Sequence, residues 1–244
     1  YIGPIDGHNI NEMLEVIGNL KDFEGPQFLH IITKKGAGLD AAEADRIEFH
    51  AIGKINSIKS SSSGSIKYQD VFGEWVVNQA ENDEKLVAIT PAMREGSGLV
   101  EFSKKFPERY FDVAIAEQHS VTFAAGLARK NKKPVVAIYS TFIQRAYDQV
   151  IHDVAVQNLD VTFALDRSGL VGEDGPTHSG NFDIAFLRCI PNIIIMAPSD
   201  EAETQKMLST GYNFNGPAVI RYPRGSGPNA KRDNLLTTIE IGKA

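Results

Sequence analysis

The stretch FDVAIAEQH, from Phe111 to His119, decides how this chain folds and where its chemistry lies. Its first six residues, Phe111 to Ala116, predict a buried strand, and Ser120 to Arg129 predict the following helix. Glu117 then falls in the turn at the carboxyl end of a strand, where open α/β sheets bind ligands. A first-turn or N-cap acid that favours the helix dipole would also explain Glu117. This residue alone does not separate the two interpretations.

The pattern after residue 67 alternates helices and strands. Helices are expected at 68–82, after 139 through Gln157, and after Asp200 through Leu208. Asp200 with Glu203 has the spacing of a capping box. Further strands are expected at 86–90, 134–139, 161–165, 192–196 and 218–221. Solidly apolar strands in such alternation predict an α/β fold, a parallel sheet covered by helices on both faces.

The pattern before residue 67 is different. Apolar residues at helical spacing predict a helix over 9–22, and QFLHIIT predicts a strand over 27–33. A glycine-rich loop follows and ends near His50. The run KSSSSGS, from Lys59 to Ser65, has the composition of a linker and marks the clearest boundary in the chain.

Composition excludes several classes of protein. The 244 residues are 42% hydrophobic and 23% charged, as in ordinary globular proteins. A net charge of −6 without a basic stripe argues against nucleic acid as a partner. The apolar runs are too short to span a membrane, and the first residues, YIGPIDGH, do not resemble a secretory signal. The chain looks like the middle of a longer protein.

Cysteine usage indicates the compartment in which the protein works. The single cysteine, Cys189, rules out an internal disulfide, and its apolar neighbours predict a buried, inert thiol. The chain contains neither CxxC nor HExxH spacing, so a zinc site built by the protein is not expected. These features fit a reducing cytoplasm.

Four predicted strand ends carry polar or aromatic residues. The loop DRSGLVGEDGPTHSG, at about 15 residues, is longer than most connections in such folds, which suggests a function. Each residue has an ordinary explanation as a surface ion pair, a core aromatic or a turn. Those explanations do not account for their meeting at one sheet edge. The residues concerned are Glu117, then Tyr139, Phe142 and Arg145, then Arg167, Asp174 and His178, and finally Arg221 and Arg224.

These motifs resemble those of the 1-deoxy-D-xylulose-5-phosphate synthases. That family belongs to the thiamine-diphosphate-dependent, transketolase-like superfamily. GEDGPTH and AEQH occur across the superfamily, whereas YSTFIQRAYDQ and RCIPN are specific to the synthases. The resemblance covers the whole chain apart from the serine-rich run, through TPAMREGSGL, FDVAIAEQH, YSTFIQRAYDQV, GEDGPTHSG, LRCIPN, APSDE and RYPRG.

The resemblance implies a cofactor site for thiamine diphosphate. Glu117 matches the glutamate that hydrogen-bonds N1′ of the aminopyrimidine and favours its imino tautomer, whose 4′-nitrogen takes the thiazolium proton. Phe142 matches the aromatic residue that stacks on the pyrimidine, and Tyr139 and Arg145 line the same wall. Further cofactor contacts are implied for His50 and for Leu39, where the family usually has an aromatic residue.

The resemblance also implies roles toward the substrates. Asp174 and His178 match polar residues that face the reacting carbons, so with Glu117 they are the expected catalytic residues. Arg167 and Arg224 match arginines that hold the acceptor's phosphate, which suits the guanidinium fork. The resemblance implies Tyr139 as a further substrate contact.

One family motif is absent. The family binds the diphosphate through Mg²⁺ with a Gly-Asp-Gly motif, and no such motif occurs here. The Mg²⁺ ligands are therefore expected upstream of Tyr1, and no metal ligand within the chain. Residues 1–55 are expected to end a first, diphosphate-binding domain, 56–66 to be a linker, 67–225 to form the pyrimidine-binding domain, and 226–244 to lead toward a third domain. The chain alone is expected to be inactive.

The implied reaction joins pyruvate to D-glyceraldehyde 3-phosphate with loss of CO₂, giving 1-deoxy-D-xylulose 5-phosphate for isoprenoid and thiamine biosynthesis. The implied protein is a cytoplasmic homodimer. The nearest alternatives are a transketolase or a pyruvate dehydrogenase β subunit. Comparing turnover of pyruvate plus glyceraldehyde phosphate with turnover of a ketose donor would separate these alternatives. The alternative from another class is a non-catalytic fragment that keeps the fold to bind a partner.

Overall fold

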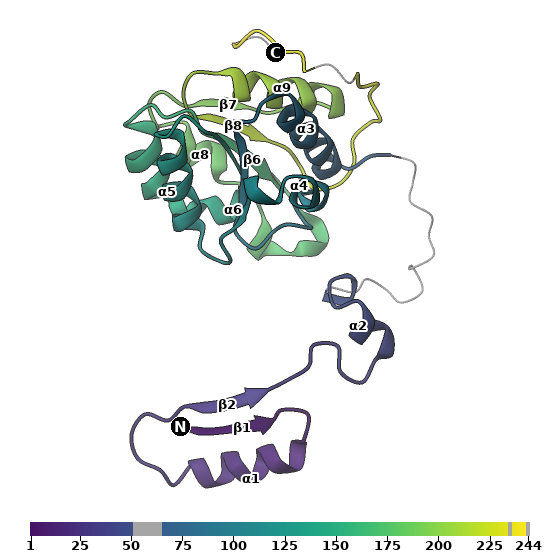
Figure 1. The fold of residues 1–244 in the computed structure, drawn as a ribbon, viewed down its shortest axis with the longest axis vertical. Coiled ribbons are helices and arrows are strands. Elements are labelled where there is room, and N and C mark those ends of the chain that lie inside the picture. Colours follow the sequence, from purple (N-terminus) through teal and green to yellow (C-terminus); the bar gives the residue numbers. More distant parts are fainter. Residues whose placement is uncertain (51–64, 234–235, 243–244) are drawn as a thin grey trace. The chain divides into compact units, whose positions relative to one another are not determined.

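The computed structural model describes residues 1–50, 65–233 and 236–242, and the chain divides into two compact units (Figure 1). The units are Tyr1–Ser62 and Ser63–Ala244. This division falls within the linker expected at 56–66, most of which lies outside the described residues. The expected domain limits stay predictions.

The first unit is a small βαβ arrangement. Strands β1 (Ile2–Asp6) and β2 (Leu29–Ile32) pair in parallel, joined by helix α1 (Ile10–Leu20). Asn9 caps α1 by accepting a hydrogen bond from the Glu12 amide, which confirms the predicted helix. Strand β1 was not predicted, because glycine and proline in IGPID are typical of a loop. The unit continues with α2 (Asp40–Ala44) and a 3₁₀ turn (Glu48–His50).

The second unit is built on a six-stranded sheet, and all its strand pairs are parallel. The strands lie in the order β4-β3-β5-β6-β8-β7. Their bounds are β3 (Leu86–Thr90), β4 (Tyr110–Asp112), β5 (Lys133–Tyr139), β6 (Thr162–Asp166), β7 (Ile194–Met196) and β8 (Ala218–Arg221).

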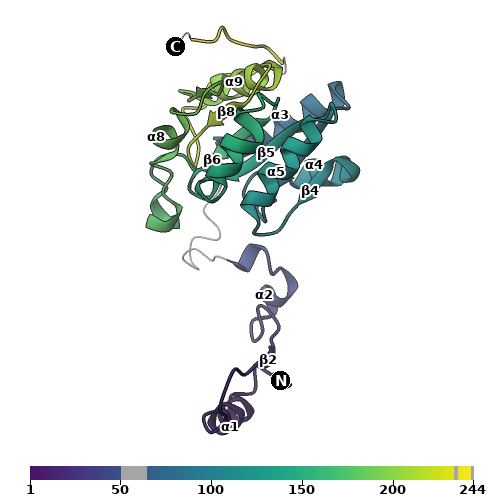
Figure 2. The same ribbon diagram turned by 90° about the vertical axis from the view of Figure 1, so that its left-hand side faces the viewer.

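Helices cover both faces of this sheet, which confirms the predicted fold class (Figure 2). On one face the core includes side chains of α3 (Tyr68–Asn82), α4 (Val100–Lys105) and α9 (Glu201–Asn213). On the other face it includes side chains of α5 (Glu117–Ala128), α8 (Asp183–Leu187) and the helical segment after β5. That segment contains α6 (Ser140–Ile143), α7 (Tyr147–Gln149) and a π-helix (Val150–Ala155).

The alternation of side chains along β5 explains why the sheet is buried on both faces. Val135 and Ala137 join the core under α3 and α9, whereas Val136 and Ile138 join the core under α5. Successive side chains of a strand point to opposite faces, so both sets must be apolar. The connection after β5 is less regular than the single long helix predicted, because it passes through 3₁₀ and π turns.

The decisive stretch around Glu117 differs from the prediction in its detail. Strand β4 ends at Asp112 and is a half-buried edge strand, not a buried strand reaching Ala116. Ala114 adopts a positive φ of 57°, and the Asp112 carboxylate accepts hydrogen bonds from the amides of Ala92 and Ala114. Both features end the strand. Helix α5 therefore begins earlier than predicted, at Glu117 itself.

Cys189 is exposed in this chain, so the prediction of a buried thiol is wrong. It lies just after the short helix α8, whose buried residues are Asp183 and Leu187. The apolar neighbours that suggested burial include Phe186, which is half-buried, and Ile190, which is buried. Residues three or four apart share a face of a helix, so Leu187 and Ile190 point inward while Cys189, between them, faces outward.

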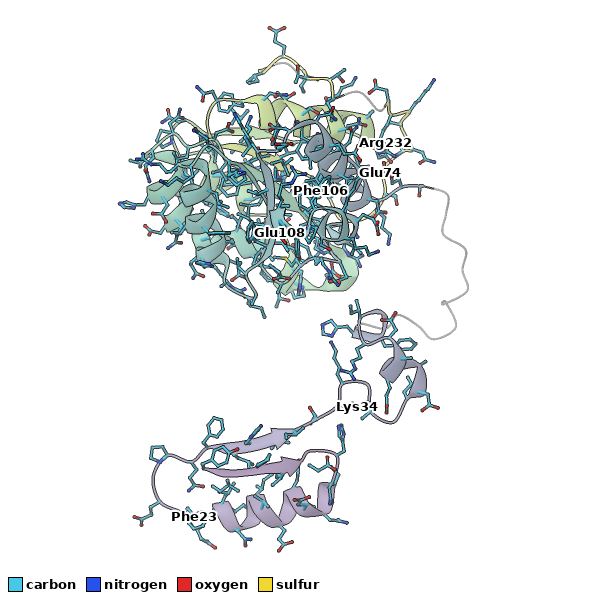
Figure 3. All side chains as sticks on the ribbon, viewed as in Figure 1. Phe23, Lys34, Glu74, Phe106, Glu108 and Arg232 are labelled. Atoms are coloured by element: carbon cyan, nitrogen blue, oxygen red, sulfur yellow. The ribbon has the colours of Figure 1, made fainter. Side chains whose placement is uncertain are left out.

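The segment after Arg224 packs on the second unit. Glu201, fully buried at the start of α9, accepts hydrogen bonds from the amides of Asn229 (3.0 Å) and Ala230 (3.1 Å). Arg232 pairs with Glu74 of α3 at 2.7 Å (Figure 3). Burial alone would raise the pKa of Glu201, but the backbone N–H groups outweigh it and hold the pKa below its usual range.

We expect Glu201→Gln to lower the free energy of unfolding at pH 7 by about 1–3 kcal/mol, because an amide accepts these hydrogen bonds less strongly. A lowered pKa stabilises the fold above the unfolded pKa and loses that effect as the pH falls through the folded pKa. The difference between the two proteins should therefore shrink below about pH 4.5 in denaturant titrations. Glu101→Gln, at an exposed ion pair, is the matched control. An equal effect of both substitutions would contradict the assignment.

Candidate functional site

The pairing of β5 with β6 brings two loops together at the carboxyl edge of the sheet. Tyr139, the last residue of β5, lies opposite Asp166, the last residue of β6. On the other side of β6, Leu165 lies opposite Arg221 of β8. The segments that follow these strand ends carry the side chains that the sequence singled out.

One group of these side chains surrounds Glu117. Glu117 is only 3% exposed, and its carboxylate forms an ion pair with Arg145. The Arg145 guanidinium also lies over the Phe142 ring, 4.9 Å from its centroid. Phe142 stacks on Tyr139 at 5.7 Å and meets the His178 ring edge-on at 5.3 Å. The structure thus connects Glu117, Arg145, Phe142, Tyr139 and His178 in one wall.

Arg167 is held by two carboxylates. Its main chain has a φ of 57°, unusual for a residue with a Cβ, and its amide donates to the neighbouring Asp166 carboxylate. Its side chain lies 2.9 Å from Asp166 and 3.1 Å from Asp174. Burial raises the pKa of Asp166 to about 7, Arg167 opposes that rise, and Asp174 adds to it.

Asp174 lies between two arginines. Its Oδ2 atom is 3.1 Å from Arg167 Nε and 2.7 Å from Arg224 Nε. Gly172 and Gly175 flank it with φ values of 63° and 80°. Both guanidinium groups predicted to bind a phosphate are therefore adjacent, with a carboxylate between them.

Tyr139 packs against the same arginine. The Arg167 guanidinium lies 3.9 Å from the centroid of its ring. Burial raises the pKa of Tyr139 to about 12, so its hydroxyl is a neutral hydrogen-bonding group at physiological pH. A Cβ at Gly96 would lie 1.9 Å from this hydroxyl, and the Gly96 carbonyl accepts from Arg167 at 3.3 Å.

Two residues of interest belong to the first unit, and one in the second unit has another partner. Leu39 and His50 belong to the first unit, where both are exposed and His50 Nδ1 lies 2.7 Å from Lys35 Nζ. Their predicted contact with a cofactor is untested. Arg221, from the same RYPRG motif as Arg224, pairs with Asp183 instead.

The sequence analysis missed two residues of the site, Asp166 and Gly96. Asp166 ends a run of apolar residues, and a carboxylate at a buried strand end is the signal that could have found it. Gly96 belongs to the quoted stretch TPAMREGSGL, but nothing in the sequence says that its loop meets β5.

Within the described ranges, no three histidine, cysteine, aspartate or glutamate side chains gather as a metal-binding group. No helix in that part of the chain is long and apolar enough to cross a membrane.

Residues 64–229 match the family model described as the transketolase, pyrimidine binding domain. The chain belongs to this family of pyrimidine-binding domains. Residues 1–33 match a second model, described as 1-deoxy-D-xylulose-5-phosphate synthase.

Similar curated proteins include several 1-deoxy-D-xylulose-5-phosphate synthases. Those of Hahella chejuensis and Marinomonas sp. are each 63% identical to this chain, over 249 and 247 residues. The alignments cover 100% of this chain and 39% and 40% of those proteins. The chain thus spans about two fifths of the length of these relatives.

Solved transketolases have the same fold. A "split gene transketolase, inactive beta4 tetramer" aligns with a TM-score of 0.64 at 27% identity, over 74% of this chain and 58% of that one. The transketolase of Campylobacter jejuni aligns with a TM-score of 0.62 at 21% identity, over 67% of this chain and 27% of that one.

The raised pKa of Asp166 predicts a pH-dependent stability. A carboxyl group whose pKa rises on folding stabilises the fold below its unfolded pKa, and that contribution is lost as the pH rises through about 7. We expect Asp166→Asn to unfold at higher denaturant concentration than the wild type at pH 8. Each unit of raised pKa contributes roughly 1.4 kcal/mol.

The two proteins should converge near pH 3.5, where the wild-type carboxyl group is protonated. Asp148→Asn, at an exposed position of the same unit, is the control. A stability difference between Asp166→Asn and wild type that does not change with pH would contradict the assignment.

Proposed function

We propose that the full-length protein carrying this chain is a 1-deoxy-D-xylulose-5-phosphate synthase. It joins pyruvate to D-glyceraldehyde 3-phosphate with release of CO₂. The similarity to synthases over the whole chain supports this reaction. The observation that carries the proposal is the buried Glu117 carboxylate at the carboxyl edge, joined through Arg145 to an aromatic wall.

These residues fit the aminopyrimidine half of thiamine diphosphate. Glu117 offers a buried carboxylate as hydrogen-bond acceptor, and Phe142 offers a half-buried ring for stacking. Ser140, at the start of α6, has a buried hydroxyl oxygen with no hydrogen-bond partner among the residues that the structure describes. A ligand with polar groups on one edge and an aromatic face matches this combination. When bound, the cofactor supplies the electron sink for decarboxylation and carbon–carbon bond formation.

Arg167 and Arg224 bind the phosphate of the acceptor. The two Nε atoms converge on one Asp174 oxygen, so the space between them already accommodates an anionic oxygen. Asp174 and His178 lie on the same loop and hold or move protons near the reacting carbons. Tyr139 is a neutral phenol, so it contributes a hydrogen bond and no charge.

The resemblance supports four further assignments. The diphosphate binds through Mg²⁺, whose ligands belong to a part of the full-length protein beyond this chain. Leu39 and His50 of the first unit reach the cofactor. The full-length enzyme works in the cytoplasm as a homodimer, and the 244-residue chain alone does not turn over substrate.

Replacing Glu117 tests the cofactor assignment. The protein to use is a chimera in which residues 1–244 replace the corresponding segment of the Hahella chejuensis relative. In this chimera we expect Glu117→Gln to lower kcat by at least about 100-fold with saturating cofactor, because an amide is a poor partner for the protonated pyrimidine nitrogen. Glu108→Gln, at an exposed position of the same domain (Figure 3), should leave kcat unchanged. A near-normal kcat of Glu117→Gln would contradict the cofactor assignment and would mean that Glu117 only stabilises the start of α5.

Replacing Arg224 tests phosphate recognition in the same chimera. We expect Arg224→Ala to reduce kcat/KM for D-glyceraldehyde 3-phosphate by roughly 10- to 150-fold, the cost of losing a hydrogen bond to a charged group. The KM for pyruvate should change little. Arg224→Lys should restore only part of the loss, because an ammonium keeps the charge but not the fork.

The decisive comparison for Arg224 uses unphosphorylated glyceraldehyde, for which wild type and Arg224→Ala should differ far less. Arg232→Ala removes an arginine from the packed tail and serves as the control. Equal losses with both acceptors would mean that Arg224 supports the structure and does not bind the phosphate.

A further inference from the structure

The loop between β6 and α8 carries Asp174 and His178, yet little apolar packing holds it. Leu170 is 84% exposed and Phe182 is 62% exposed, whereas Val171 is buried. Segments with few buried apolar side chains open at low free energy. Asp174 is paired with Arg167 and Arg224, and His178 contacts Phe142. Polar contacts at the base of the loop add to these and hold the loop backbone that carries both side chains.

Two glycines close the base of the loop. Gly169 and Gly180 form an antiparallel bridge, and each amide donates to the other's carbonyl at 2.8 Å. A Cβ on Gly180 would lie 2.3 Å from the Arg167 carbonyl oxygen, so this close approach requires glycine. The bridge defines the loop 169–180, but its backbone hydrogen bonds alone do not attach it to the sheet.

A buried ion pair attaches both ends of this loop to β8. Asp183, the residue that begins α8, is 1% exposed and accepts from Arg221 Nε at 2.9 Å and Nη2 at 3.2 Å. The Ser168 hydroxyl, just before the loop, donates to the same carboxylate at 3.1 Å. The Ser168 amide donates to the Tyr222 carbonyl at 3.0 Å. Asp183 thus joins the residue before the loop, the helix after it and the strand beside it.

We propose that Arg221 and Asp183 are positioning residues that hold the loop 169–180, and with it Asp174 and His178, at the carboxyl edge of the sheet. The functional meaning of this role rests on the proposed function. Arg221 is well suited to it, because a guanidinium that bonds a carboxylate through two nitrogens fixes the orientation as well as the distance. It projects from a strand paired on both sides, which gives it a rigid base.

Stability alone is a weak explanation for this pair. Apolar residues of similar shape often stabilise a protein as well as a buried ion pair does, because desolvation of both charges offsets their attraction. The pair provides what apolar residues lack, a carboxylate that accepts a directional hydrogen bond from the Ser168 hydroxyl across the base of the loop.

The test is amide hydrogen exchange of the 244-residue chain, which does not depend on any reaction. We expect Asp183→Asn to accelerate exchange in residues 169–180 at least about 10-fold more than in β3. Arg221→Lys should give an intermediate acceleration, because its charge remains but its second bond is lost. Asp83→Asn removes the charge from the group that accepts the Tyr212 hydroxyl at the opposite edge and is the matched control. It should not affect the loop selectively.

Ser168→Ala keeps the proposal testable if the charge variants do not fold. It leaves the Arg221–Asp183 ion pair intact and removes the hydroxyl that contacts Asp183 and the Leu165 carbonyl. It should still accelerate exchange selectively in residues 169–180. Unchanged exchange in the loop, or an equal increase throughout the second unit, would overturn the proposal. Loss of activity in Glu117→Gln with unaltered loop exchange in Asp183→Asn would uphold the proposed function and reject this inference.

Discussion

The register between β5 and β6 is the constraint on which the rest of the site depends. It places Tyr139 opposite Asp166, so that the two neighbouring strands end side by side at the carboxyl edge of the sheet. The residues that follow, from Phe142 on one side and Arg167 on the other, then face a common space. A shift by one residue would turn these side chains to the opposite faces of the sheet. Apolar side chains on both faces of β5 prevent such a shift, because either face would then lose its fit to the helices.

Charge balance is the second constraint. Asp166, Arg167, Asp174 and Arg224 alternate in sign and contact one another in that order. Burial disfavours the ionised form of Asp166, while its contact with Arg167 favours it. The strained backbone of Arg167 belongs to the same arrangement. Such features reduce stability, and their concentration around one sheet edge is typical of a functional site.

Regular elements with strong periodicity could be predicted from the sequence. The helix Tyr68–Asn82 and the strand Leu86–Thr90 have the predicted limits, because apolar spacing and buried packing agree there. The strand expected to reach Ala116 was wrong, since an apolar run does not reveal the positive φ of Ala114. The resemblance named Glu117, Phe142, Tyr139 and Arg145 for the site, and the structure brings them together. It did not reveal Asp166, whose importance lies in its burial, or Asp183, whose importance lies in its contact with Arg221, a residue distant in sequence.

The proposed function requires the carboxyl edge around Glu117 and Phe142 to accept the pyrimidine half of the cofactor. The most direct measurement is an NMR titration of the 244-residue chain with 4-amino-2-methylpyrimidine, which needs neither the diphosphate site nor turnover. We expect saturable chemical-shift changes centred on Glu117, Ser140 and Phe142, and we expect Glu117→Gln to abolish them. Shifts centred elsewhere on the second unit, or shifts that persist unchanged in Glu117→Gln, would contradict the proposed function.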